Sequence, residues 1–326
     1  MVIADENNGY NFQPEILEIL NGIQGNIYND RFDNAEILTD SLFTIDSTGP
    51  LLYLFRAVLF QARMMAAESD FLKNQFMQAL DSTAQISRTL LKNGEDSLLA
   101  YYCLGNAHAF RSLYEGRGGH MWNALRQGLA ARGFYSKGYQ LDTTFHDIAV
   151  GLGSYRYWKS VKTDAINWTP LFKDEKDNGI RLLERAADSS IFSRDAAKTA
   201  LIWVYINEKM YGQALRLIDQ MQRRYPFGLT FLWARGELYF KLGNYSQAIE
   251  VYRKIMGRLE DVPGNYYNLV EAAWFLDRCY RRTERKWQNH DTTRRDLAKK
   301  IESLPLPETT RKRQEDKLKS ILEISR

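Results

Sequence analysis

Apolar residues recur at the three- and four-residue spacing of an amphipathic helix along almost the whole chain. Pro14 opens the first such segment, in which Ile16, Leu20, Ile23 and Ile27 fall on one helical face. No convincing run alternates apolar and polar side chains as a half-buried strand does. The pattern therefore predicts an all-α protein.

The breaks between these apolar stripes, many at Gly, Asn or Pro, predict antiparallel helix pairs. Residues 1–13 are polar, and we expect a flexible N-terminus there. We expect a loop at Asn167–Pro170, inside the fourth pair. The pairs are expected over residues 14–45, 51–91, 97–141, 145–187, 194–226 and 228–263, followed by a long helix at 265–287 and charged helices at 291–304 and 308–324.

One structural pattern is repeated within residues 200–263. The residues that recur 34 positions apart are Tyr205 and Tyr239, Tyr211 and Tyr245, and Ala214 and Ala248. A fixed period of 34 that carries two aromatic residues and an alanine is the signature of a helix–turn–helix repeat. These residues resemble the tetratricopeptide repeat (TPR) family, clearly over residues 194–263 and in degenerate form elsewhere.

The resemblance implies a right-handed superhelical solenoid of stacked antiparallel helix pairs. Residues 14–288 would form this helical-repeat domain, with atypical longer repeats at 14–190 and regular repeats at 194–263. Small residues such as Gly236 and Ala248 would let helices approach closely beside the Tyr252 ring. Residues 289–326 would form charged capping helices, because a solenoid needs a polar end to shield its last apolar face.

The resemblance also implies a concave groove lined by the first helix of each pair. The positions that would face a peptide or protein partner are Trp203, Ile206, Thr230, Trp233, Glu237, Phe240, Tyr267, Glu271 and Trp274. A looser match extends this line to Tyr102, Asn106, Val150, Ser154 and Tyr157. Aromatic residues in a groove are typical anchors for a peptide, but the same residues also serve as packing wedges between helices. The sequence leaves both roles open for Trp203 and Trp233.

The function expected from this resemblance is a non-catalytic scaffold that binds a peptide or protein segment. Ala200 and Ala234 stand where repeats that hold the C-terminal tails of chaperones have polar side chains, which disfavours that role. The alternative is an exported, periplasmic TPR protein that binds a small solute or associates with an envelope complex. Val2-Ile3-Ala4 suits a signal cleavage site, so the expected location is cytoplasmic as given and periplasmic if the chain was trimmed there.

Composition and charge change this picture little. Of 326 residues, 44% are hydrophobic and 26% charged, which is typical of a globular protein, and no apolar run reaches membrane-spanning length. Residues 281–326 carry 14 basic and 8 acidic side chains. Because the two signs alternate along this segment, we interpret it as a solvated cap and do not expect nucleic acid as a partner. The oligomeric state stays open.

No motif in the sequence predicts a catalytic residue, a cofactor or a metal. Cys103 and Cys279 fall in apolar helical patterns, which predicts buried free thiols. Gly116–His120 lacks the strand and the lysine of a phosphate-binding loop, so it is interpreted as an interhelical turn. His108 and His120 could converge, but their spacing to Cys103 does not place metal ligands on one helical face. We expect a protein that is not an enzyme.

Overall fold

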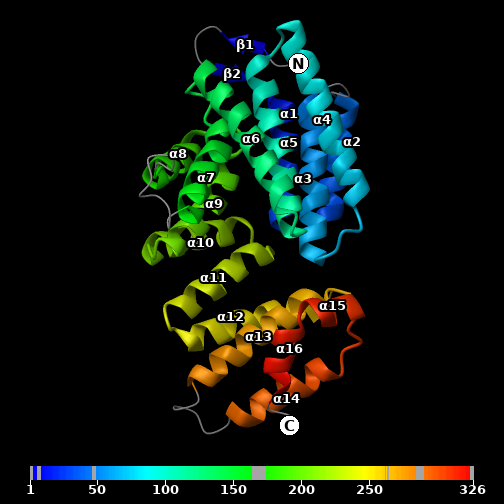
Figure 1. Ribbon diagram of the computed structural model, residues 1–326, viewed down its shortest axis with the longest axis vertical. Coiled ribbons are helices and arrows are strands. Elements are labelled where there is room, and N and C mark those ends of the chain that lie inside the picture. Colours follow the sequence, from blue (N-terminus) through cyan, green and yellow to red (C-terminus); the bar gives the residue numbers. More distant parts are fainter. Residues whose placement is uncertain are drawn as a thin grey trace. The chain divides into compact units, whose positions relative to one another are not determined.

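The computed structural model of the chain describes residues 3–5, 9–45, 49–163, 174–260, 262, 264–283 and 290–323, with side chains from residue 12 onward except 290–292. Within these ranges the structure is helical, as predicted, apart from a short antiparallel strand pair, β1 (Ile3–Asp5) and β2 (Gly9–Asn11) (Figure 1). The sequence did not predict this pair, because three residues are too few for an alternating pattern to show. The predicted loop at Asn167–Pro170 lies outside the described residues.

The chain divides into two compact units. The first unit comprises residues 1–62 and 72–208, and the second comprises residues 63–71 and 209–326. One division after Glu208 separates α9 (Arg194–Asn207) from α10 (Tyr211–Arg224). These two helices are the ones that the sequence pairs as the first regular repeat.

The first unit consists of helices that follow one another through short turns. Its helices are α1 (Pro14–Tyr28), α2 (Phe32–Ile45), α3 (Pro50–Ala67) up to residue 62, α4 (Lys73–Asn93), α5 (Ser97–Arg117), α6 (Met121–Leu141), α7 (Asp147–Lys162), α8 (Lys176–Ser189) and α9. From α4 to α9 each helix contacts the next one along the chain. In addition, α7 contacts both α5 and α9, so helices two positions apart also stack.

Small residues and one large ring explain the close packing of α5, α6 and α7. The buried ring of Tyr135, on α6, lies against Gly105 of α5 and Gly151 of α7, and a Cβ atom at either glycine would overlap it. The sequence predicted this kind of contact, in which a small residue on one helix accepts a ring from the next. The predicted interhelical turn at Gly116–His120 is confirmed, since α5 ends at Arg117 and α6 begins at Met121.

The loop between α8 and α9 carries the centre of an aromatic cluster. Phe192 is buried, and its ring makes edge contacts with Phe12, Phe55, Tyr102 and Phe145 at centroid distances of 5.3–6.4 Å. The carboxylate of buried Asp147, on α7, fixes the loop between α8 and α9. It accepts hydrogen bonds from the backbone N–H groups of residues 191, 192 and 193 at 2.8, 3.1 and 2.7 Å. One buried aspartate side chain therefore satisfies a turn that would otherwise leave its donors without acceptors.

The second unit contains the cleaner repeat and the C-terminal helices. Its helices are α10, α11 (Leu229–Lys241), α12 (Tyr245–Glu260), α13 (Tyr266–Thr283), α14 (His290–Glu302), α15 (Glu308–Arg313) and α16 (Glu315–Leu322) (Figure 1). Tyr252 is fully buried at the α11–α12 crossing, where a Cβ atom on Gly236 would lie 2.8 Å from its Cζ atom. Its ring also stacks on Phe275 of α13 at 4.9 Å. Ala248 is fully buried, as the repeat pattern requires.

The C-terminal helices belong to the hydrophobic core of this unit. Leu297 and Ile301 of α14, with Leu318 and Ile321 of α16, are buried in one cluster with α12 and α13. A buried carboxylate reinforces this packing. Asp277 of α13 accepts hydrogen bonds from Arg281 Nε at 2.6 Å and from Arg294 Nε of α14 at 2.8 Å.

Residues 63–71 also belong to the second unit. The side-chain amides of Asn265 and Asn268 donate to the carbonyl of Ala66 at 2.8 and 2.9 Å. Arg313 pairs with the carboxylate of Glu68 at 3.1 Å. These polar contacts join a short segment from early in the chain to helices from its end.

Candidate functional site: an aromatic and arginine face

The predicted groove residues of the first unit are mainly packing residues. Trp203 is half-buried and Ile206 is 3% exposed, so Ile206 offers no accessible surface to a partner. On the looser extension, Tyr102 and Tyr157 are buried. The Tyr157 hydroxyl donates to Glu208 at 2.7 Å and accepts from Asn207. The structure therefore gathers no accessible aromatic row from these positions.

The predicted residues on α11 differ in the side chains that they contact. Trp233 is half-buried and its ring makes an edge contact with Tyr252 at 6.0 Å, which is a packing contact in the core. Glu237 pairs with Lys241 one turn further along the helix at 3.5 Å. Thr230 is half-buried at the start of α11. Phe240 lies near the end of the helix, half-buried among other rings.

The C-terminal helices contact the three predicted residues of α13 and cover two of them, Tyr267 and Glu271. Arg313 stacks on Tyr267 at 4.3 Å from the ring centroid, and Lys317 lies 5.1 Å from that of Trp274. Glu271 accepts a hydrogen bond from Gln314 at 3.1 Å and pairs with Lys317. This part of the predicted groove is thus occupied by the protein's own α15 and α16. Sequence reasoning did not foresee this, because helix spacing does not show where a later helix packs.

Beside this covered part, aromatic and arginine side chains gather on α11, α12 and α13. We call them the aromatic–arginine face, which comprises Phe240, Tyr245, Trp274, Arg278 and Arg282. The guanidinium of Arg278 lies 4.7 Å from the Phe240 centroid and 4.4 Å from that of Trp274. The guanidinium of Arg282 lies 4.9 Å from Phe240 and 5.6 Å from Tyr245. Each cation therefore rests on two rings.

The local sequence explains this arrangement. Trp274, Arg278 and Arg282 are four residues apart, so they form a row along α13. Phe240 and Tyr245 flank the turn from α11 to α12, and their rings make an edge contact at 5.6 Å. Each cation–π contact at a partly exposed site is worth about 0.5–1 kcal/mol, which is enough to orient a flexible arginine.

The two arginines carry positive charge that the described side chains do not neutralise. Arg281, on another side of α13, pairs with Asp277, whereas neither Arg278 nor Arg282 has a carboxylate oxygen within 4.0 Å among the side chains that the structure describes. Arg282 donates one N–H to the carbonyl of Arg278 at 3.4 Å. Among the described residues, the other guanidinium N–H groups of the two arginines have no acceptor, so an external acceptor can bind them there.

The sequence predicted Phe240 and Trp274 but missed both arginines. The family pattern maps partner contacts onto fixed positions, and it does not mark residues 278 and 282. The signal that could have found them is the i, i+4 row that begins at Trp274. Cys279 lies between the arginines and is a buried free thiol, as predicted, and so is Cys103. Burial raises the Cys279 pKa to about 12, although both guanidiniums act to lower it, so the thiol is unreactive.

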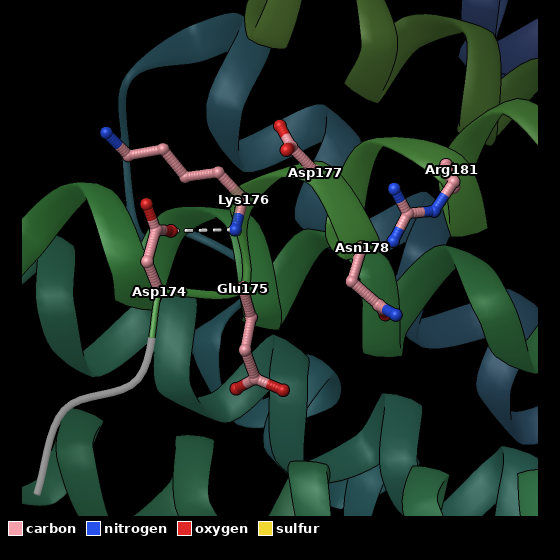
Figure 2. A pocket seen from close by; sticks show the side chains of 6 residues that line it. All are labelled: Asp174, Glu175, Lys176, Asp177, Asn178 and Arg181. Atoms are coloured by element: carbon pink, nitrogen blue, oxygen red, sulfur yellow. Dashed lines mark hydrogen bonds between the residues drawn. The ribbon is translucent and has the colours of Figure 1, made fainter. Parts of the chain in front are cut away.

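A second surface feature is a hollow of about 340 Å³ at the start of α8, lined by Asp174, Glu175, Lys176, Asp177, Asn178 and Arg181. Asp174 accepts a hydrogen bond from the backbone N–H of Lys176 at 2.9 Å (Figure 2). Figure 2 shows that Glu175 points away from Lys176 and Asp177. The Glu175 carboxylate pairs with Lys159 Nζ at 3.2 Å. Charges of both signs line this hollow, and residues 164–173 just before it lie outside the described residues. We assign it no ligand.

Among the described side chains, the histidines do not form a metal site. The Nδ1 atom of His120 pairs with Glu115 at 2.9 Å on the surface. His108 is half-buried, stacks on Phe134 and has its Nδ1 atom 2.6 Å from Gln127 Oε1. Within the described part of the chain, no three His, Cys, Asp or Glu side chains are grouped as metal ligands.

None of the described helices is both long and apolar enough to span a membrane. A scan of protein-family models and a search of curated proteins both found no match to this sequence.

Proposed function

We propose that this protein is a non-catalytic scaffold of the TPR type, which holds a peptide or protein segment on the second unit. In this proposal the stacked helix pairs form a right-handed superhelical solenoid, and α14 to α16 cap its end. The contacts between consecutive helices and the 34-residue repeat of Tyr and Ala support this architecture.

The aromatic–arginine face is the observation that carries the proposal. Protein interfaces are enriched in Trp, Tyr and Arg, and a few such residues supply most of the binding energy. On this face rings and guanidiniums hold one another in fixed orientations, so little side-chain entropy is lost when a partner binds. The covered residues Tyr267 and Glu271 then act in attaching the C-terminal helices, and the partner would contact Phe240, Trp274 and the arginines.

The proposal is tested by selecting peptides from a displayed random library with the full chain and measuring their affinity. Trp274→Ala removes one of the two rings under Arg278, and we expect a loss of about 2 kcal/mol, roughly thirtyfold in Kd. Trp122→Ala is the matched control, because that side chain is 85% exposed in the first unit. Failure to select any peptide, or equal losses in both variants, would remove the proposal. Trp233 is less suitable for this test, since its ring contacts the core.

A further inference from the structure

We infer that the segment bound by the aromatic–arginine face is acidic, with Asp or Glu carboxylates that reach Arg278 and Arg282. This inference rests on the proposed function and adds the chemistry of the partner. The arginines are four residues apart on α13, and each is held on two rings. Stacking uses the flat face of a guanidinium and leaves N–H groups at its edge, where a carboxylate binds with two parallel hydrogen bonds.

Charge complementarity supports this choice of partner. The nearby carboxylates already have partners: Glu237 pairs with Lys241, Glu271 with Lys317, and Asp277 with Arg281 and Arg294. Arg278 and Arg282 have no such partner among the described side chains. An acidic segment would supply the missing negative charge, and its apolar side chains would contact the exposed parts of the rings.

The same face is poorly suited to nucleic acid. Single-stranded nucleic acid binds by stacking its bases on open aromatic faces along a continuous positive groove. Here guanidiniums of the protein itself lie over Phe240, Tyr245 and Trp274.

Three labelled probes test the inference by fluorescence anisotropy with the full chain at physiological ionic strength. They are a ten-residue peptide of alternating Glu and Leu, the same peptide with Gln in place of Glu, and an oligothymidylate of ten nucleotides. We expect the Glu peptide to bind at least about tenfold more tightly than the Gln peptide, since hydrogen bonds to charged groups are the stronger ones. We also expect it to bind more tightly than the oligonucleotide.

Variants then locate the site. Arg278→Gln with Arg282→Gln should weaken binding of the Glu peptide at least about tenfold. The matched control, Arg216→Gln with Arg223→Gln, removes the same charge from exposed side chains on α10 and should change the affinity less than about twofold. Phe240→Leu keeps every charge but removes the ring under both arginines, so it should also weaken binding. If the double variant unfolds, Arg282→Gln alone is used, because that side chain is exposed.

The outcomes separate this inference from the proposed function. Equal binding of the Glu and Gln peptides would overturn the acidic partner and leave a peptide scaffold in place. Tighter binding of the oligonucleotide, or equal losses in the two double variants, would also overturn it, because either result indicates unspecific charge. If the Glu peptide fails to bind while library selection yields neutral peptides, only the inference fails.

Discussion

At the scale of single residues, the packing of this protein depends on where a methyl group has room. Gly236 and Gly257 lie on neighbouring helices of the second unit, yet their surroundings are opposite. A Cβ atom at Gly236 would meet the buried Tyr252 ring at 2.8 Å, whereas one at Gly257 would have nothing within 4 Å. The repeat pattern marks Gly236 as a contact position and does not mark Gly257.

We therefore expect opposite effects from the same substitution. Gly236→Ala should lower the free energy of unfolding by about 1–3 kcal/mol, because Tyr252 is held by Phe275 and cannot move away. Gly257→Ala should raise it by about 0.5–1 kcal/mol, because alanine favours helix. Denaturant unfolding measures both. A stabilising Gly236→Ala would contradict the close helix crossing.

His108 gives the first unit a dependence on pH. Burial lowers its pKa from the usual 6.5, and the nearby Arg88 and Arg111 act in the same direction. The unfolded chain therefore takes up a proton more readily than the folded one. The neutral imidazole of His108 therefore favours the folded state fully above pH 6.5. This contribution to the free energy of unfolding is lost as the pH falls from 6.5 through the lowered pKa of the folded state.

We expect His108→Gln to flatten the stability of the first unit against pH below 6.5. The glutamine has no proton to gain, and the other three histidines stay in place as an internal control. Unfolding by denaturant at a series of pH values checks this. If the variant keeps the pH dependence of the wild-type free energy of unfolding, that dependence arises from other titratable groups.

At the scale of elements, α13 is the helix on which the second unit is organised. One side carries the core residues, and Asp277 beside them holds α14 through Arg294. On the opposite side, α15 and α16 cover the first turns, and the last turns present the arginines. The apolar stripe with Leu269, Ala272 and Leu276 marks the helix in the sequence, but it does not show which later helices pack on the polar side. This explains why the sequence predicted the helix but not the use of each side.

The buried ion pair between α13 and α14 can be compared with an exposed ion pair between α12 and α14. Asp277→Ala should cost about 3–5 kcal/mol, since the Arg294 guanidinium stays buried without its carboxylate. Glu260 and Lys300 also join α14 to a neighbouring helix, α12, but this pair is largely exposed. Glu260→Ala should cost about 0–1 kcal/mol. Comparable losses in denaturant unfolding would mean that Asp277 is not a buried anchor.

At the scale of the whole molecule, the chain divides into two compact units. The fold class was predictable, because helix periodicity is a local property and the chain shows it almost throughout. The domain boundaries expected at 14–288 and 289–326 stay predictions, and the compact units follow other boundaries. Residues 63–71 join the second unit through contacts of Asn265, Asn268 and Arg313, and such distant contacts leave no periodic trace in a sequence.

Removal of residues 289–326 should cause association. These residues carry Leu297, Ile301, Leu318 and Ile321, which cover apolar surface of α12 and α13. Light scattering after size-exclusion chromatography measures the resulting mass. In the full chain, Ile321→Asp should destabilise the second unit, whereas Lys319→Asp, on an exposed side chain, should not. A monomeric truncated chain with unchanged melting would mean that these helices are dispensable.

The candidate site was predictable only in part. The resemblance to the repeat family named Trp274 and Phe240 as partner contacts, and both belong to the aromatic–arginine face. The same resemblance named Tyr267 and Glu271, but α15 and α16 cover them. Arg278 and Arg282 were missed because an arginine on a ring and an arginine in water look alike in a sequence. Only neighbouring helices decide which one is present.

The sequence by itself determined the helices, most of their ends and the positions where small residues meet rings, since spacing along one chain encodes these. The tertiary structure alone decided which residues group into each compact unit, which end of the chain covers α13 and which charges stay without a partner. The physical reason is the distance along the chain between the residues that interact. Helix formation depends on residues three and four apart, whereas burial and charge pairing also join side chains that lie hundreds of positions apart, as Arg313 and Glu68 do.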